Sequence, residues 1–209
     1  MTTLRFPACL SVLSALSLGA IALAAPPKAS GLLNWRGPDQ TGVLQGAGFP
    51  EKWGGPGEEG HLWTYKVKGG GTPVIANGKL YAFGYYDDPK DLSDVQEALI
   101  CLDPETGKLE WEYRFRDYIS DVVYNRYAVG SPIVDAETGN IYLQGSNGRL
   151  MAFGEDGSKL WEHSLIEKLA RLTFPNGRTG SLGLQGPVVI VHCVTANWGT
   201  TGPARDRLY

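Results

Sequence analysis

The feature that most limits the possible folds is an internal repeat. Similar segments are closed by Trp63, Trp111 and Trp161, which stand 48 and 50 residues apart. A second marker, glycine followed by serine or threonine, recurs in step with the tryptophans at 71–73, 130–132 and 180–182. Repeated units of about 20–50 residues can bury their apolar faces only by stacking on neighbouring units. The chain is therefore expected to be a repeat protein.

Within each unit apolar and polar residues alternate, and this period of two indicates β-strands. Asn77-Gly78 and Asp156-Gly157 separate apolar runs, and such pairs indicate hairpin turns because their residues readily adopt positive φ. The first unit predicts strands at 72–76, 79–84, 98–102 and 109–115, with a polar loop between 84 and 97. Later strands are predicted at 131–135, 140–145, 149–153, 159–164, 180–185 and 188–193.

Four short antiparallel strands in a unit of about 50 residues describe one blade of a β-propeller. The predicted fold class is all-β: a β-propeller of four-stranded antiparallel blades, present here as about 2.5 blades plus one leading strand around Trp63. After an insertion at 195–203, residues 207–209 align with 149–151, and the chain stops within the third unit. Because propellers close with about 4–8 blades, we expect this chain to be part of a longer protein.

The composition excludes three other classes of protein. With 28 Gly and 13 Pro in 209 residues, the chain is too rich in turn-forming residues for a helical bundle or coiled coil. With 43% hydrophobic residues, it can bury enough apolar surface to fold and is not disordered. A formal net charge of -3 argues against a protein that wraps nucleic acid.

The first 24 residues have the layout of a secretory signal peptide. A positive charge at Arg5 precedes an apolar run that ends in the small-residue cleavage site Ala22-Leu23-Ala24. The run is short for a membrane span, which needs about 20 residues. We expect residues 1–24 to be removed, 25–60 to form a leader and linker, and 61–209 to form the propeller repeats. The predicted location is secreted or periplasmic, with no transmembrane span after cleavage.

Residues that could bind metals are sparse. Cys101 and Cys193 lie in apolar runs, and the sequence leaves open both a disulfide between them and two buried free thiols. The three histidines stand apart from one another, so no zinc site is expected. Four aspartates between residues 87 and 94 crowd the predicted loop, where a solvated acidic loop is favoured over a calcium site.

The segment 101–111, with the pattern Asp-x-x-Thr-Gly-x-x-x-Trp, resembles the tryptophan-docking repeat of the bacterial secreted pyrroloquinoline-quinone (PQQ)-like propellers. Residues 152–161 are a copy shortened by one residue, and residues 34–43 resemble the leader of that family. The resemblance covers residues 32–209. It implies that the Trp rings are buried between adjacent blades and that side-chain hydrogen bonds tighten the turns. It assigns a structural repeat motif to Trp63, Asp103, Thr106, Gly107, Trp111, Gly157 and Trp161.

The PQQ-like family includes quinoprotein dehydrogenases, which hold PQQ and Ca²⁺ in the central funnel, and ligand-free scaffolds. The dehydrogenases share a vicinal Cys-Cys pair over the quinone, and this sequence has no such pair. The resemblance therefore implies an extracytoplasmic binding or scaffold module, and no cofactor and no dehydrogenase activity are expected of this chain alone. The alternative is a quinoprotein-type oxidoreductase whose PQQ- and calcium-binding residues lie in further blades. A carbohydrate-active enzyme, or its accessory subunit, is a third hypothesis.

The best candidate binding residues lie in the connectors between blades, which emerge on one rim of a propeller. Arginine with aromatic residues is typical of recognition surfaces, although the same residues can brace neighbouring loops. The expected partner is a protein, a small molecule or a carbohydrate, and not a nucleic acid. The candidate rim residues are Tyr124, Asn125, Arg126, Asn176, Arg178 and, in the insertion of the third unit, Trp198.

Overall fold

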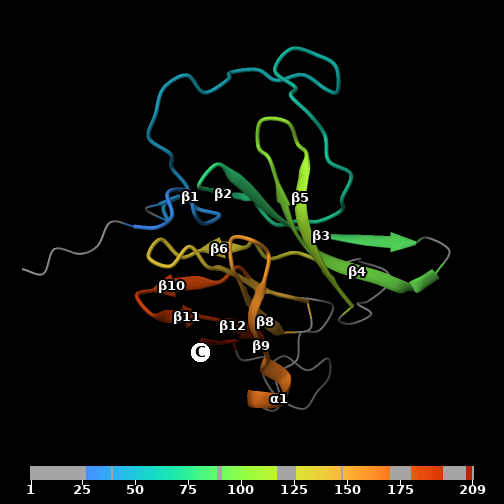
Figure 1. Ribbon diagram of the computed structural model, residues 1–209, viewed down its shortest axis with the longest axis vertical. Helices are drawn as coiled ribbons and strands as arrows, with labels where there is room; N and C mark the ends of the chain where they lie inside the picture. Colours follow the sequence, from blue (N-terminus) through green and yellow to red (C-terminus); the bar gives the residue numbers. More distant parts are fainter. Residues whose placement is uncertain are drawn as a thin grey trace, which may run out of the picture.

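The computed structural model describes residues 27–38, 40–88, 91–116, 126–146, 148–169, 180–194 and 206–208. The strands are β1 (Gly31–Leu32), β2 (Val74–Ala76), β3 (Lys79–Asp88), β4 (Asp91–Leu102), β5 (Leu109–Phe115), β6 (Ile133–Val134), β7 (Ile141–Gln144), β8 (Arg149–Phe153), β9 (Lys159–Ser164), β10 (Gly183–Gln185), β11 (Val188–Ile190), β12 (His192–Val194) and β13 (Asp206–Leu208). The described helix is α1 (Leu165–Leu169), which opens the connector after β9. The fold is nearly all-β, as predicted (Figure 1).

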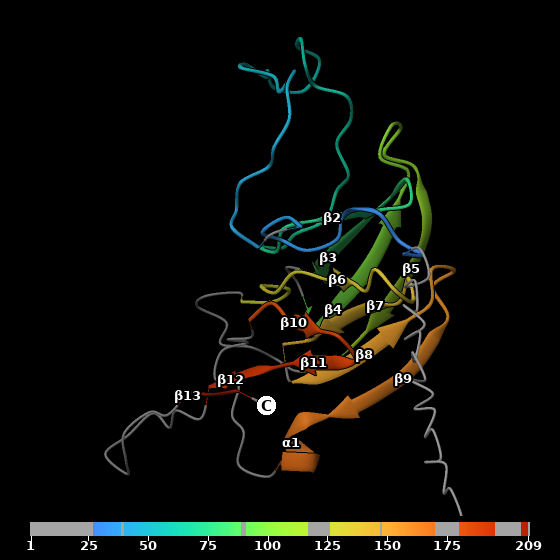
Figure 2. The same cartoon turned by 90° about the vertical axis from the view of Figure 1, so that its left-hand side faces the viewer.

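The strands form successive antiparallel sheets, each built like the blade of a propeller (Figure 2). The first sheet has the order β1-β2-β3-β4-β5, and the second has the order β6-β7-β8-β9. The third unit contains the hairpin β10–β11 and the pair β12–β13, and only Val191 separates β11 from β12. The chain is thus an incomplete β-propeller, and the predicted fold class is confirmed.

The boundaries of β5, β8 and β9 fall at the residues predicted from the sequence. The prediction of a polar loop between residues 84 and 97 is wrong. Strands β3 and β4 continue through this stretch as one long hairpin, with Tyr85 opposite Glu97 and Asp88 opposite Asp91. This hairpin arm projects from the first sheet in Figure 1.

The acidic residues of the arm are compatible with strands because distant basic residues pair with them. Lys68 Nζ lies 2.7 Å from Asp87 Oδ1, and Arg116 forms an ion pair with Asp94. Both basic residues come from other segments of the chain, before β3 and after β5. The polar sequence of this stretch therefore indicated a loop, whereas its ion pairs with residues distant in the sequence stabilise a strand.

The leader contributes a strand to the first sheet. It contains β1, which adds a fifth strand to the first sheet beside β2. The predicted leading strand around Trp63 runs along this sheet, but its backbone makes only one isolated bridge among the described residues, Lys68 to Tyr85. Between the two, residues 43–60 form a wide arc that stands away from the sheets (Figures 1 and 2).

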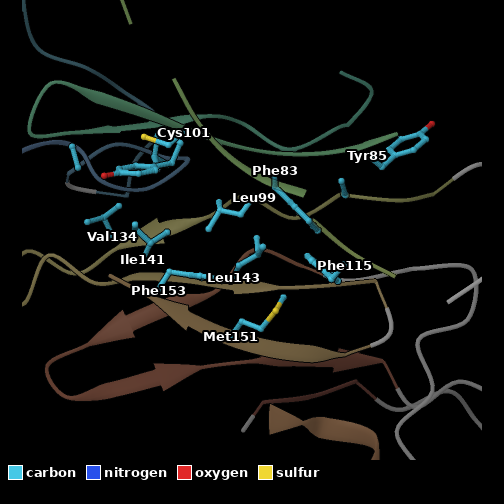
Figure 3. Close-up of a cluster of buried hydrophobic side chains, with 14 of the residues drawn as sticks. Phe83, Tyr85, Leu99, Cys101, Phe115, Val134, Ile141, Leu143, Met151 and Phe153 are labelled. Carbon is cyan, nitrogen blue, oxygen red and sulfur yellow. The ribbon is translucent and has the colours of Figure 1, made fainter. Parts of the chain in front are cut away.

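Three apolar clusters lie between successive layers, as stacked blades require. The first cluster, between the first and second sheets, includes Tyr81, Phe83, Leu99, Cys101, Phe115, Val134, Ile141, Leu143, Met151 and Phe153 (Figure 3). The second joins the second sheet to the third unit through Ile133, Leu150, Leu165, Leu182 and Val191. The third lies on the opposite face of the first sheet and includes Ala98, Ile100 and Leu102, with Trp63, Tyr65 and Val67 packed on them. Neighbouring residues of β4 thus enter opposite clusters, which explains the period of two in the sequence.

Three further predictions concern the signal peptide, a membrane span and the cysteines. The predicted signal peptide, residues 1–24, lies outside the described residues. Within the described ranges, no helix is long and apolar enough to cross a membrane. Cys101 is a buried free thiol, so the free-thiol alternative holds for this residue.

Candidate functional site

Successive sheets approach one another most closely at the start of their first blade strands. A Cβ atom on Gly71 would lie 2.1 Å from the carbonyl oxygen of Gly130, and a Cβ on Gly130 would lie 3.0 Å from that of Gly180. Only glycine permits such contact between backbones. Strand β2 also contacts β6. The repeated glycine marker is therefore a contact between blades, and we call this side of the sheets the inner edge.

The serine that follows the glycine of this marker makes a second repeated contact between blades, through its hydroxyl group. The Thr72 N–H donates to Ser131 Oγ at 2.8 Å, and the Ser131 N–H donates to Ser181 Oγ at 3.1 Å. Each blade thus gives a hydroxyl acceptor to the backbone of the blade before it. These bonds hold the inner edge at the short spacing that the glycines allow.

The outer side of the sheets is spaced by tryptophan rings instead. Trp63 Nε1 donates to the carbonyl of Pro104 at 2.8 Å, and its ring lies against Gly107, where a Cβ would be 2.4 Å away. Trp111 repeats the arrangement one blade later: its Nε1 donates to the carbonyl of Glu155 at 3.1 Å, and its ring lies against Gly157. Between the first and second sheets, backbone contact on one side and the Trp111 indole on the other make the interface a wedge, so these two sheets diverge away from the inner edge.

The indoles of Trp63, Trp111 and Trp161 are half-buried. Trp161, in β9, packs on Tyr142 at 5.8 Å and on His163 at 5.1 Å between ring centroids. One face of the Trp63 ring and one face of the Trp111 ring cover the next turn, while each residue stays partly exposed to solvent. The rings therefore act as spacers at the surface of the wedge.

The turn that receives Trp63 is tightened by Asp103. Its Oδ1 accepts from the N–H groups of Glu105 at 2.8 Å and Thr106 at 2.9 Å. The hydrogen bond from the Thr106 N–H is the main reason why the pKa of the Asp103 carboxyl lies below its usual range. Thr106 Oγ1 in turn accepts from the Lys108 N–H at 3.3 Å, and Gly107 has a φ of 68°. These residues shape the turn and leave its glycine open to the indole.

The inner edge of the first two sheets is covered by the leader. We call residues 28–34 the strap. On one side the strap pairs with β2, with Gly31 opposite Ala76 and Leu32 opposite Ile75. Asn77 adds three hydrogen bonds to the strap backbone, two through its side chain and one through its N–H. The strap is thereby the edge strand of the first sheet.

The other side of the strap is bonded to the second sheet. The Ala29 N–H donates to the carbonyl of Ala136 at 3.0 Å, and the Val134 N–H donates to the carbonyl of Leu33 at 2.9 Å. The strap therefore bridges the inner strands of two blades. It lies at the inner edge, between the first strands of these two sheets.

Gly31 is needed for this position. Its φ of 131° falls in a region that favours glycine, and a Cβ there would lie 2.3 Å from the carbonyl oxygen of Ile75. A larger residue would push the strap off β2.

A cavity of about 360 Å³ lies where the strap leaves the inner edge. Leu33, Ile133, Val134 and Leu184 give it apolar walls, and polar residues including Asn34, Gln40, Asp135 and Glu137 line the rest. The Asp135 carboxylate is engaged by the Glu137 N–H at 3.1 Å and the Thr138 hydroxyl at 2.6 Å. The cavity is therefore an apolar hollow with a polar rim, continuous with the strap.

A buried carboxylate fixes the connector that follows the first blade. Glu97, at 2% exposure, accepts from the Ala128 N–H at 2.7 Å and the Ser146 N–H at 3.0 Å, and also from the Ser146 hydroxyl. These donors come from the connector and from the β7–β8 turn of the next blade. Buried carboxylates require such partners, so Glu97 ties the first blade to the second.

Of the candidate rim residues, the structure describes Arg126. It is half-buried and precedes Tyr127, whose ring packs on Tyr85 at a centroid distance of 5.3 Å. The other predicted rim residues lie outside the described residues: Tyr124, Asn125, Asn176, Arg178 and Trp198. In the parts of the chain that are described, no three His, Cys, Asp or Glu side chains gather as a metal site.

Sequence reasoning missed the strap and the Glu97 contact. A glycine within the otherwise apolar Gly31-Leu32-Leu33 was the available signal for the strap, because a glycine inside a strand marks close approach of another backbone. For Glu97, the signal was an acidic residue at the head of the apolar run 98–102. Neither signal identifies its partners, which lie about 30 or more residues away in the sequence.

The fold and these repeated contacts define a β-propeller of the PQQ-like repeat type. The profile of the family described as outer membrane protein assembly factor BamB matches residues 54–196. This match covers more than half of the chain, and the chain belongs to that family. The predicted family resemblance is confirmed. A search of curated proteins finds no match.

Two solved structures illustrate the similarity to larger propellers. A quinohemoprotein alcohol dehydrogenase from Comamonas testosteroni is 19% identical with a TM-score of 0.40, over 61% of this chain and 17% of that chain. A europium-containing methanol dehydrogenase is 16% identical with a TM-score of 0.48, over 70% of this chain and 24% of that chain. The present chain thus spans less than a quarter of either matched chain.

Proposed function

We propose that this chain is an extracytoplasmic β-propeller module that binds a partner or serves as a scaffold. The observation that carries the proposal is the strap, which is bonded to both blades at the inner edge. Its backbone occupies the convergence of the blades, the place that a ligand in a central funnel would need. The described repeat residues mainly join one blade to the next, which supports an architectural role.

The residues at the inner edge do not fit a quinone there. A small-molecule site must enclose most of its ligand, and the strap takes up that space with hydrogen bonds to both sheets. Cys101 is on β4, away from the inner edge, buried in the first cluster with its Sγ 3.9 Å from Glu110 Oε2. We therefore assign no chemical step to PQQ or Ca²⁺ in this chain.

Two observations support a location outside the cytoplasm. The matching family is described as an outer membrane protein assembly factor, and residues 1–24 have the signal-peptide pattern. N-terminal sequencing of the exported protein should begin at Ala25. A mature protein that still begins at Thr2 or Thr3 would contradict the proposed export.

The absence of quinone chemistry can be tested on the full chain. The protein is titrated with PQQ in the presence and absence of Ca²⁺, and alcohol or sugar oxidation is assayed with an artificial electron acceptor. We expect no saturable quenching of tryptophan fluorescence at micromolar PQQ and no calcium-dependent turnover. Micromolar binding accompanied by turnover would replace the binding-module proposal with the quinoprotein alternative.

A further inference from the structure

The strap lies in a slot that provides hydrogen bonds along both of its sides. We propose that this slot is a peptide-binding site of the strand-addition type, closed in this chain by its own residues 29–33. The inference rests on the proposed binding function and names its ligand class: an extended peptide segment of a partner protein. The ligand would enter by replacing the strap.

The slot presents a donor and an acceptor on the β6 side. The Val134 N–H and the carbonyl of Ala136 are met by Leu33 and Ala29, so one extended segment of five residues spans both groups. On the opposite side, β2 offers a strand edge to the backbone at Gly31 and Leu32. These are main-chain interactions, which give affinity to any extended peptide in strand addition.

The side chains of the strap define which peptide fits. Ala29 is 3% exposed, so its position accepts only a small residue. The position of Gly31 requires glycine, because a Cβ would meet the carbonyl oxygen of Ile75 at 2.3 Å. Leu33 packs against the first apolar cluster, so the fifth position favours an apolar residue. The expected ligand therefore carries the pattern small-x-Gly-x-apolar.

The connection of the strap to the body allows exchange. After the turn at residues 34–37, the chain continues into the exposed arc at 43–60, which carries no strand or helix. Displacement of the strap breaks its hydrogen bonds to both sheets and the contacts of Ala29 and Leu33 with the first cluster. The other members of the first cluster, and the second cluster, still join the blades, and a peptide in the slot would restore the lost bonds.

The test uses a fluorescein-labelled synthetic peptide of residues 27–36 and the full chain with Gly31→Val, whose own strap cannot seat. We expect the peptide to bind this variant at least tenfold more tightly than the wild-type chain, whose slot is filled. A control peptide with Gly31→Val should bind neither chain. Fluorescence anisotropy gives the affinities, and circular dichroism verifies that the variant is folded.

A second variant keeps the proposal testable if Gly31→Val does not fold. Ala29→Phe places a bulky side chain at a strap position that is only 3% exposed, so the chain's own strap seats poorly while every residue of the slot is unchanged. This variant should bind the wild-type peptide more tightly than the unmodified chain does. If the folded variants bind neither peptide, or bind both equally, the slot is not a peptide site. The PQQ titration is independent of this result, so failure of the slot and failure of the proposed function can be told apart.

Discussion

Single residues set the spacing between blades, with glycine on the inner side and tryptophan on the outer side. The glycines at 71 and 130 permit backbone contact, whereas Trp63 and Trp111 hold the opposite sides apart. Each class of residue can be tested against a matched residue of the same type elsewhere in the chain.

Gly71→Ala should destabilise the protein by about 2–3 kcal/mol, near the upper end for overpacking of a rigid contact. The new methyl group would meet backbone atoms of Gly130 and Ser131, which cannot rotate away. Gly70→Ala is the matched control, because the nearest atom to its Cβ is 4.0 Å away. This control should be neutral or slightly stabilising. Urea denaturation measures both free energies of unfolding, and equal decreases for the two variants would contradict the proposed inner-edge contact.

Trp111→Ala should lower the free energy of unfolding by about 3 kcal/mol. This is the lower end of the range for a buried tryptophan, because the ring is half-buried. The variant removes the hydrogen bond to Glu155 and leaves Gly157 uncovered. Trp53→Ala removes a tryptophan that is 74% exposed, and it should change the free energy of unfolding by less than about 0.5 kcal/mol. Urea denaturation of both variants compares the two directly, and similar small losses would show that Trp111 is no spacer.

Cys101 should be unreactive in the folded protein at pH 8. Burial raises the pKa of its thiol to about 12, so the reactive thiolate is not formed at that pH. The folded state then holds a proton that the unfolded chain loses above about pH 9, so this group lowers stability as the pH rises from about 9 to 12. Iodoacetamide labelling followed by peptide mass mapping should modify Cys101 in urea but not in buffer. Rapid modification in buffer would contradict its placement in the first cluster.

At the scale of elements, local patterns predicted the hairpins and long-range contacts determined the rest. The alternating runs of β5, β8 and β9 give the strand boundaries because each strand buries one set of alternate residues on each face. The arm beyond Gly84 was not predictable in this way, since its aspartates become compatible with a strand only through Lys68 and Arg116.

The candidate site was less predictable than the fold. The strap depends on partners about 45 and 100 residues away in two sheets, and no local pattern encodes such a pairing. The predicted rim residues were chosen by composition, and the structure describes only Arg126 among them. Binding by the rim therefore stays a prediction.

Glu97→Gln should destabilise the protein by about 2–3 kcal/mol, the upper part of the range for hydrogen bonds to a charged group. The Ala128 N–H and the Ser146 N–H donate to different oxygens of Glu97, so the NH2 group of glutamine would face one of these two donors and leave it without an acceptor. Glu105→Gln, at an exposed position in the Asp103 turn, serves as the control and should be within about 0.5 kcal/mol of wild type. The free energies come from urea denaturation, and a loss no larger than that of the control would remove Glu97 as the link between the blades.

At the scale of the whole molecule, three apolar clusters and two repeated edge contacts produce a fan of blades. The short inner spacing and the wide outer spacing give the fan its curvature, and the strap closes the inner edge of the first two blades. Membership in the propeller family follows from the matched profile, whereas the closed inner edge is the feature on which the proposed binding function depends.

Native-state hydrogen exchange tests the closed inner edge most directly. The amides of Ala29, Asn77 and Val134 each donate across the boundary between the strap and a blade. The account predicts that these amides exchange far more slowly than those of Phe49 and Trp53 in the exposed arc, because each of the three is hydrogen-bonded across the boundary. The Gly31→Val variant should lose protection at the three strap contacts and keep it within the sheets. Exchange of Ala29, Asn77 and Val134 as fast as that of the arc would show that the strap does not occupy the inner edge.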